Sequence, residues 1–489
     1  MGRERGDGRV WRAWRGLGWA LPAALAAACA VNPATGAREF NMVSEGQEIA
    51  MGQQGGQSVR QSQALLPDSA MQAYVARIGQ RIARASERPQ LPWRFTTLDD
   101  PIINAFAMPG GEIFFTRGIL THFNSEAEFA AVMGHEIGHV TARHTARAMS
   151  RQQLAGLGLG LGALLSQDVA QMAGALQQGL GLLFLKFGRG DESQADELGF
   201  RYMVAQRYDP DAMADVFAML SRVSGGGRRL PEWQSTHPDP ENRERVTRAR
   251  IDSAFRGRPR ADLAEGRNEY LRRLDGMVYG ENPRQGFFRG AQFLHPELAF
   301  SLTFPDGWQL QNGEDAVVAG EPQGAAVVQL QLDQGTPEEA ARRFLGQQGV
   351  QVGQTGTLRA GIGTGVSATF GAQGQQGAME GMAMWVAWNG RTFRVMGLSG
   401  AGGLSRFGAA FEATMRSLSP VRDRAVLDIQ PHRVDIVTVP RAMTAEAFLQ
   451  AFPSSVAAEK VLLVNNWLPG QQLAAGSLAK RIVQGRAGR

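Results

Sequence analysis

Cysteine is almost absent from this chain of 489 residues, since Cys29 is the single one. One cysteine excludes an intramolecular disulfide. A strong net charge is also lacking. The formal charge is +5, and the residues before Leu17 supply five arginines against two acids, which leaves +2 on the rest of the chain. So small a charge gives no electrostatic footprint for nucleic acid, while 43% hydrophobic and 20% charged residues exclude wholesale disorder.

The N-terminus lacks an apolar run long enough for a permanent membrane helix, because Leu17–Ala28 has only 12 residues. Arginines precede this run and Cys29 follows it, which is the order of a bacterial secretion signal. The stretch Leu25–Cys29 resembles a lipobox, with Ala26 where a large apolar residue usually stands. We therefore expect residues 1–28 to be a signal peptide and Cys29 to be lipidated. An ordinary cleaved signal and an inert buried cysteine are the alternatives. Ala30 follows the cysteine, and in the sorting pattern of lipoproteins this favours the outer membrane over the inner one. The expected location is therefore the periplasm, with an anchor in the outer membrane.

The rest of the chain divides into regions of different patterning. Residues 29–255 are mainly helical, with one short β-like region in which Pro109-Gly110-Gly111 predicts a hairpin turn. The charged stretch 256–285 is the expected linker. Residues 286–420 predict an antiparallel α+β domain, with Asn389-Gly390 as a hairpin signal. The tail, residues 427–489, shows the order strand, helix, helix, strand.

One apolar, glycine-rich segment, Leu154–Phe187, lies inside the helical region. Ser166-Gln167-Asp168 divides it, and neither half reaches the length of a membrane span. Two buried or groove-lining helices are one interpretation. A surface that contacts a membrane or an outer-membrane client protein is the other.

The motif that carries chemistry is His135-Glu136-Ile137-Gly138-His139, an HExxH pattern. Residues four apart lie on one face of a helix, so both imidazoles can bind one metal ion. Glu136 lies about 100° further round the helix, where it can hold a metal-bound water without being a ligand. Ser125 and Glu128 predict a capping box at the start of this helix. A charged helix with two ordinary surface histidines is the alternative.

A catalytic zinc site needs a third protein ligand, and Glu192 is the best candidate. It opens a predicted helix in which Asp196 shares its face, while Ala195 and Gly199 are small enough for close helix contact. Asp196 is expected to accept the outer N–H of a ligand histidine; an exposed helix charge is the alternative. His144 lies five residues after His139, an offset that places it on another side of the helix, so no role is expected for it.

Together these motifs resemble the zinc metalloprotease family that includes CAAX prenyl proteases, the heat-shock protease HtpX and the periplasmic protease BepA, and in particular its soluble BepA-like branch. The resemblance covers roughly residues 29–250. Its elements, in chain order, are Asn32-Pro33 with Thr35-Gly36, Asn104-Ala105-Phe106 with Pro109-Gly110-Gly111, His135–His139, the Glu192/Asp196 pair, and Thr236-His237-Pro238.

The resemblance implies a mainly α, zincin-type metalloprotease domain with a small β-hairpin or sheet edge, and one Zn2+ per chain. It implies that Asn104, Ala105 and Phe106 form the edge strand on which an extended substrate adds. His237 is expected beside the metal, either stabilising the oxyanion or acting as a reversible fourth ligand. From the sequence alone, a histidine before proline is more often a turn residue. Arg243 is expected to contact substrate or a carboxylate.

The C-terminal half departs from the BepA pattern, because we find no 34-residue period typical of tetratricopeptide repeats. Its tail resembles a degenerate LysM module, a peptidoglycan-binding βααβ fold, but Ala442-Met443-Thr444 stands where Gly-Asp-Thr is usual. Sugar binding and a structural cap are both open for this tail.

The sequence thus predicts a periplasmic zinc endopeptidase that hydrolyses misfolded or misassembled envelope proteins, with Glu136 as general base. Three alternatives are a chaperone-like assembly factor for outer-membrane proteins, a cell-wall-associated enzyme tethered to peptidoglycan by its tail, and a zinc hydrolase of another substrate class. Outer-membrane assembly machinery is a further expected partner.

Overall fold

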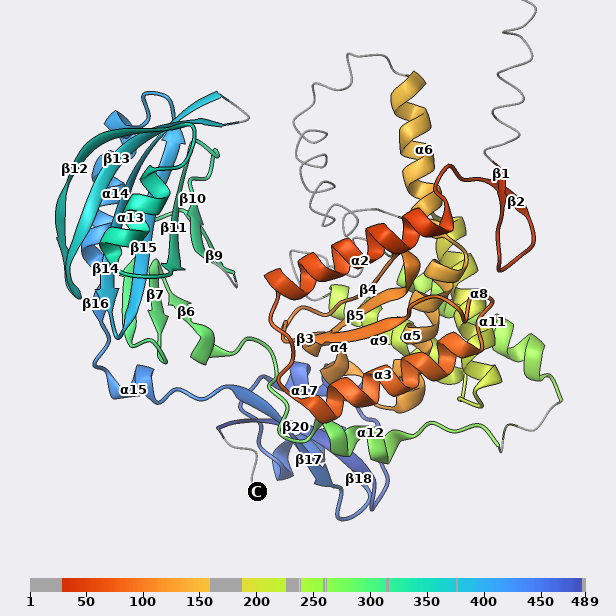
Figure 1. Ribbon diagram of the computed structural model, residues 1–489. Helices are drawn as coiled ribbons and strands as arrows, with labels where there is room; N and C mark the ends of the chain where they lie inside the picture. The colour runs from red at the N-terminus through yellow and green to blue at the C-terminus, as the bar shows by residue number, and fades with distance from the viewer. Residues whose placement is uncertain are drawn as a thin grey trace, which may run out of the picture. The chain divides into compact units, whose positions relative to one another are not determined.

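The computed structural model describes residues 29–158, 187–225, 237, 239–257, 260, 262–313, 316–374 and 377–485 (Figure 1). The chain forms two compact units. The first consists of Met1–Met277 together with Val434–Val483, and the second of Val278–Arg433 with Gln484–Arg489. The tail expected as a module of its own is therefore grouped with the helical region that precedes the α+β domain.

The first unit contains a three-stranded sheet with the strand order β3-β5-β4. Its strands are β3 (Arg94–Leu98), β4 (Ala105–Met108) and β5 (Glu112–Thr116). β3 runs parallel to β5 and β4 antiparallel to it. The predicted hairpin turn is confirmed: Gly110 has a φ of 76°, a conformation that costs glycine little. A side chain at Gly52 would collide with the Pro109 carbonyl oxygen, so this turn packs directly on a helix. In the strand order β3-β5-β4, β4 lies at the edge of the sheet.

Nine helices lie in the described part of the first unit before the second unit begins. They are α2 (Glu45–Ser62), α3 (Ser69–Arg84), α4 (Arg117–His122), α5 (Glu126–Thr141), α6 (His144–Gly158), α8 (Arg189–Ala205), α9 (Asp211–Gly225), α11 (Pro240–Phe255) and α12 (Arg267–Leu274). A short hairpin, β1 (Cys29–Val31) and β2 (Arg38–Phe40), precedes them.

Helix α5 is the centre of the first unit, because its residues from Ala127 to Thr141 are all buried. It packs closely on α8. A Cβ atom added at Gly199 would lie 2.9 Å from the backbone nitrogen of His135, and one at Gly134 would lie 3.1 Å from Gly199. The prediction that small residues permit close helix contact here is confirmed. This close packing brings side chains from α8 next to the HExxH motif.

The tail forms β17 (His432–Thr438), β18 (Met443–Thr444), α16 (Ala445–Ala451), α17 (Ala458–Val464), β19 (Gln472–Leu473) and β20 (Leu478–Gln484). β17 pairs with β20, and β18 with β19. Fully buried Lys480 of β20 donates hydrogen bonds to the carbonyl oxygens of Thr121 and Phe123, at 3.0 and 2.9 Å. Asn124 donates to the carbonyl of Val464 at 3.3 Å. The tail therefore packs on the loop that leads into α5.

The second unit is built on a seven-stranded antiparallel sheet with the order β12-β13-β14-β15-β11-β10-β9, and a four-stranded sheet with the order β16-β8-β7-β6. The strands are β6 (Phe287–Arg289), β7 (Gln292–His295), β8 (Phe300–Thr303), β9 (Gln309–Asn312), β10 (Val317–Gly320), β11 (Ala326–Asp333), β12 (Val350–Ala360), β13 (Gly363–Gly374), β14 (Gly377–Trp388), β15 (Arg391–Gly400) and β16 (Ser419–Pro420). Helices α13 (Pro337–Leu345), α14 (Leu404–Ser417) and α15 (Arg424–Leu427) accompany them.

Two hydrophobic cores lie on opposite faces of the large sheet of the second unit. Met384 packs with Phe411 of α14, whereas the next residue, Trp385, packs with Phe344 of α13. Successive strand residues point to opposite faces, so both faces are covered. Asn389 and Gly390 have φ angles of 47° and 74°, as a type I′ turn requires, and the predicted hairpin is confirmed. The predicted α+β character of this region is confirmed as well.

Most of the apolar segment Leu154–Phe187 lies outside the described residues, so neither interpretation of it is tested. Within the described ranges, every helix is too short or too polar to cross a bilayer.

Candidate metal centre

The helix that carries HExxH begins at a well-formed cap. Ser125 accepts a hydrogen bond from the backbone N–H of Glu128 at 3.1 Å, which satisfies one of the free donors of the first turn. In a complete capping box, the carboxylate of Glu128 would in turn accept from the backbone N–H of Ser125. Here it accepts from the N–H of Asn124 instead, at 2.6 Å. Glu128 therefore also fixes the loop residue that contacts the tail.

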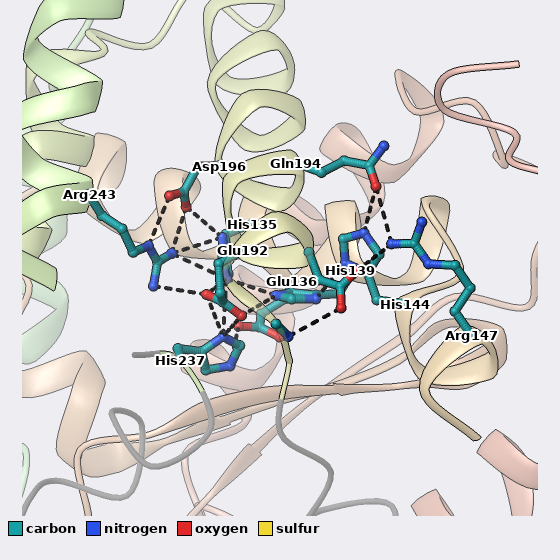
Figure 2. Close-up of polar contacts among 12 residues, drawn as sticks. His135, Glu136, His139, His144, Arg147, Glu192, Gln194, Asp196, His237 and Arg243 are labelled. Atoms are coloured by element: carbon teal, nitrogen blue, oxygen red, sulfur yellow. Dashed lines mark hydrogen bonds and ion pairs between the residues drawn. The ribbon is translucent and has the colours of Figure 1, made fainter. Parts of the chain in front are cut away.

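Four buried side chains converge at the middle of the first unit (Figure 2). They are His135 and His139 of α5, Glu192 of α8, and His237 just before α11, and one ligand atom from each lies within 4.8 Å of all the others. The Nε2 atoms of the two α5 histidines are 3.0 Å apart. Glu192 lies 3.6 Å from His135 Nε2 and 3.5 Å from His139 Nε2. The two helices thus bring the predicted ligands together.

Asp196 and Arg243 hold His135 from behind. The Nδ1 atom of His135 lies 2.9 Å from Oδ1 of Asp196, so this ring donates its outer N–H to the carboxylate and directs Nε2 at the cluster. Arg243 of α11 pairs with Asp196, and its Nη1 atom lies 3.0 Å from Glu192 Oε2 (Figure 2). The guanidinium also lies 4.4 Å from the ring centroid of Phe217. Arg243 is thus placed as a carboxylate partner and is itself buried.

Glu136 lies beside the cluster rather than in it. It is only 1% exposed, and burial raises the pKa of its carboxyl to about 7, with His237 opposing and Glu192 adding to the rise. Its Oε1 atom is buried without a hydrogen-bond partner among the described residues and lies 3.8 Å from His237 Nε2. A carboxyl that titrates near neutral pH can both take up and release a proton.

The charge on Glu192 is set by its cationic neighbours. Burial alone raises the pKa of this carboxyl, but His237 and Arg243 outweigh it and hold the pKa below its usual value. The Nδ1 atom of His237 lies 3.0 Å from Glu192 Oε1. Burial lowers the pKa of His237, yet Glu192 and then Glu136 raise it above the ordinary histidine value. Glu192 is therefore ionised and available as an anionic ligand.

The predicted substrate strand lies next to the base. Asn104 precedes β4, and Ala105 and Phe106 lie in it. The backbone N–H of Ala107 donates to the carboxylate of Glu136, so this edge of β4 faces the cluster. The ring of Phe106 stacks on Phe114 at 5.0 Å and belongs to the core between α2 and the sheet. Phe106 thus anchors the strand through its ring, and β5 is the only described strand that pairs with β4.

The structure places His144 against His139, not on another side of a continuous helix as the five-residue offset predicted. α5 ends at Thr141, and Arg143, with a φ of 60°, turns the chain before α6 begins at His144, so the helical spacing of α5 does not extend to His144. Its Nδ1 atom lies 2.8 Å from Nδ1 of His139, and its Nε2 atom 2.9 Å from Oε1 of Gln194. The sequence does not signal this turn, because Ala142-Arg143-His144 contains no glycine or proline and arginine rarely adopts a positive φ.

The donor set fits a zinc ion. Two imidazoles and a carboxylate are the ligands of many catalytic zinc sites, and both ligand histidines have an outer partner for Nδ1. The unpartnered Oε1 of Glu136 beside the cluster supplies an acceptor for a water molecule. Cys29 begins β1, but its side chain is outside the described part of the structure.

Comparison with known proteins finds similarity over the part of the chain that holds this cluster. Residues 69–251 match the model of peptidase family M48. The beta-barrel assembly-enhancing protease of Yersinia pestis is 33% identical over 210 residues, which are 40% of this chain and 42% of that protein. Its counterpart in Escherichia coli is 32% identical over 223 residues, 43% of this chain and 45% of that protein. The mitochondrial metalloendopeptidase OMA1 of Schizosaccharomyces pombe is 32% identical over 216 residues, 44% of this chain and 64% of that protein.

The match with the first two relatives thus spans less than half of their length. The accessory unit, residues 278–433, lies beyond the segment that matches the family model.

Proposed function

We propose that the chain is a zinc-dependent endopeptidase of the cell envelope, since residues 69–251 match the model of peptidase family M48. One observation carries the proposal: a carboxylate from α8 meets two imidazoles from α5, and both of those rings are held by outer hydrogen bonds. His135, His139 and Glu192 are the proposed ligands. Glu136 is the proposed general base.

Zinc in this site would polarise the scissile carbonyl and lower the pKa of a water molecule from about 16 towards about 7. Glu136 accepts the proton of the attacking water at its carboxylate, and then delivers it to the nitrogen of the leaving amine. Its pKa, raised to about 7 by burial, suits both transfers near neutral pH. Arg243 and Asp196 keep the ligand His135 oriented while this occurs.

His237 has two roles open to it. Its Nδ1 atom, 3.0 Å from Glu192, lies in the ligand set, which supports a reversible fourth ligand that keeps the site closed at rest. Its Nε2 atom, 3.8 Å from Glu136, faces the reacting groups, which supports oxyanion stabilisation. In His237→Ala a lost latch raises the rate of peptide cleavage, whereas a lost oxyanion donor lowers it about 100-fold.

The proposed substrate is an extended polypeptide. β5 pairs with one side of β4, and no described strand pairs with the other. Because the N–H of Ala107 on that other side already reaches Glu136, a peptide added there would run past the general base. Main-chain pairing selects for an unfolded segment rather than for one sequence. Misfolded or misassembled envelope proteins are therefore the proposed clients.

The proposed location is the periplasm, with a lipid on Cys29 as the anchor to the outer membrane. The secretion-signal pattern of residues 1–29 supports it. Relatives named beta-barrel assembly-enhancing proteases support a role in outer-membrane protein quality control, in contact with assembly machinery. Tethering to peptidoglycan by the tail has less support, because Lys480 of the tail is used in packing on the peptidase unit.

The decisive measurement is zinc content of the purified chain, followed by casein cleavage with and without a chelator. We expect about one zinc per chain and cleavage that stops on chelation and returns with zinc. Glu136→Gln should retain zinc and lose at least 100-fold in cleavage rate. Undiminished cleavage by this variant, or cleavage unaffected by chelators, contradicts the proposal.

A second candidate function is chaperone-like assistance to outer-membrane assembly, which the edge strand β4 also supports. The two functions separate in a strain that lacks the protein and shows an assembly defect. If binding alone suffices, Glu136→Gln restores assembly. If cleavage is required, this variant fails although it reaches wild-type abundance.

A further inference from the structure

The two proposed zinc-binding histidines of α5 have different outer partners. His135 donates its outer N–H to Asp196, an anion that is neutralised by Arg243. His139 instead contacts the ring of His144, Nδ1 to Nδ1 at 2.8 Å, with the ring planes at 79°. His144 is fully buried, so this contact is shielded from water. The HExxH pattern itself contains no residue that corresponds to His144.

Only one proton arrangement suits the contact between His139 and His144. A ring nitrogen binds a metal through its lone pair, so if Nε2 of His139 is the ligand, its proton sits on Nδ1 and is donated to His144. His144 must then accept at Nδ1 and carry its own proton on Nε2. That proton faces the amide oxygen of Gln194 at 2.9 Å, which can accept it.

The orientation of the Gln194 amide decides whether this chain of bonds is consistent. The same Oε1 atom lies 3.4 Å from Nη2 of Arg147, and a guanidinium can only donate. An oxygen, not the NH2 group, therefore faces His144. Arg147 is itself held by Glu39 at 2.5 Å and by Asp191. The end of the chain is thus fixed by an ion-pair network.

We propose that His144, oriented by Gln194, is a positioning residue that holds His139 in the tautomer able to bind zinc through Nε2. The inference rests on the proposed function, because it takes His139 as a zinc ligand. It also gives α8 three tasks within five residues: Glu192 binds the metal, Gln194 fixes His139 through His144, and Asp196 fixes His135 directly.

The test compares zinc affinity among variants of the full chain, by competition with a chromophoric chelator. His144→Leu removes the acceptor and should weaken zinc binding about 10- to 100-fold. His144→Asn keeps a carbonyl oxygen near the same place and should recover most of the affinity. Ser150→Ala is the matched control: Ser150 is also buried on α6, but it contacts Asn41 and Met42 instead of the centre.

A second readout reports the tautomer itself. In the zinc-loaded chain labelled with 15N-histidine, His139 should show a protonated Nδ1 and a metal-bound Nε2, and His144 a protonated Nε2. If His144→Leu does not fold, Gln194→Leu tests the same chain from its half-buried end, with an expected loss of several-fold in zinc affinity.

Each outcome bears on the proposal. Zinc affinity of His144→Leu within twofold of wild type overturns it, and so does an equal loss in His144→Asn and His144→Leu, which would indicate packing alone. Both results leave the proposed peptidase intact. A wild-type chain that binds no zinc overturns the inference together with the proposed function.

Discussion

The guanidinium of Arg243 forms a two-point ion pair with Asp196, with Nη2 2.6 Å from Oδ1 and Nε 2.9 Å from Oδ2. Both residues are buried, and the pair is shared with Glu192. Arg243 therefore compensates the charges of two carboxylates to which the proposed metal centre gives different roles.

Replacing Arg243 by methionine should destabilise the first unit by about 3–5 kcal/mol, because it leaves buried carboxylates without a counter-charge. Urea unfolding of the zinc-free chain measures this. Arg248→Met is the matched control on the same helix: its ion pairs with Glu244 and Asp215 are about half exposed, and its loss should cost below about 1 kcal/mol. Equal losses of unfolding free energy in the two variants would show that Arg243 does not stabilise the buried carboxylates.

Glu192→Gln should abolish stoichiometric zinc binding, since a neutral amide oxygen replaces an ionised ligand at the centre of the cluster. We expect a loss of affinity of at least about 100-fold and a proportional loss of cleavage at limiting zinc. Glu197→Gln, on the exposed face of the same helix, should bind zinc as the wild type does. Metal analysis after dialysis checks both. Retained zinc in Glu192→Gln would require a different third ligand.

His122, at the end of α4, should make stability depend on pH. Burial lowers the pKa of this ring to about 4, so on acidification the unfolded chain takes up the proton near pH 6.5 and the folded chain does not. The stability that the neutral, buried ring of His122 contributes is complete above pH 6.5 and is lost as the pH falls towards 4. At pH 5 it should cost roughly 2 kcal/mol of unfolding free energy relative to pH 7.5.

The variant His122→Asn isolates this effect. Its amide can still donate to the carbonyl of Gly118, as Nδ1 of His122 does at 2.7 Å, but it does not titrate. The difference in unfolding free energy between pH 7.5 and 5 should therefore shrink by about 2 kcal/mol relative to the wild type. An unchanged difference would mean that other groups set the acid response.

Lys480→Met should lower the stability of the first unit by roughly 1–3 kcal/mol, because the carbonyl oxygens of Thr121 and Phe123 lose their buried donor. Thermal unfolding measures this, and the loss should reduce cleavage at elevated temperature before it affects cleavage at 25 °C. Exposed Lys460 of α17 provides the control, and Lys460→Met should be neutral. If Lys480→Met is as stable as the wild type, the tail contributes little to the stability of the first unit.

Local signals in the sequence predicted much of the fold and of the site. The spacing of His135 and His139 placed two rings on one face, and the turns at Gly110 and at Asn389-Gly390 formed as their residue types predict. Long-range contacts were not accessible in the same way. His237 was placed by family resemblance, and the packing of Lys480 depends on residues that no periodicity connects.

His144 shows how one backbone angle can defeat a spacing argument. Between Gly138 and Gly156 the sequence has no glycine or proline, so an uninterrupted helix through His144 was the natural expectation. The positive φ of Arg143 is stabilised by tertiary contacts, since its side chain reaches Glu48 of α2 at 2.8 Å. Such a turn depends on another helix and is therefore invisible to local reasoning.

The contact between Lys480 and Thr121 joins residues 359 positions apart, with the whole accessory unit inserted between them. The loop that leads into α5 thus gains this contact only after the chain has grown past the accessory unit. A chain that has been synthesised only as far as the accessory unit lacks β20, so its first unit cannot yet form this contact. Folding of the first unit is therefore not complete until the accessory unit has been synthesised.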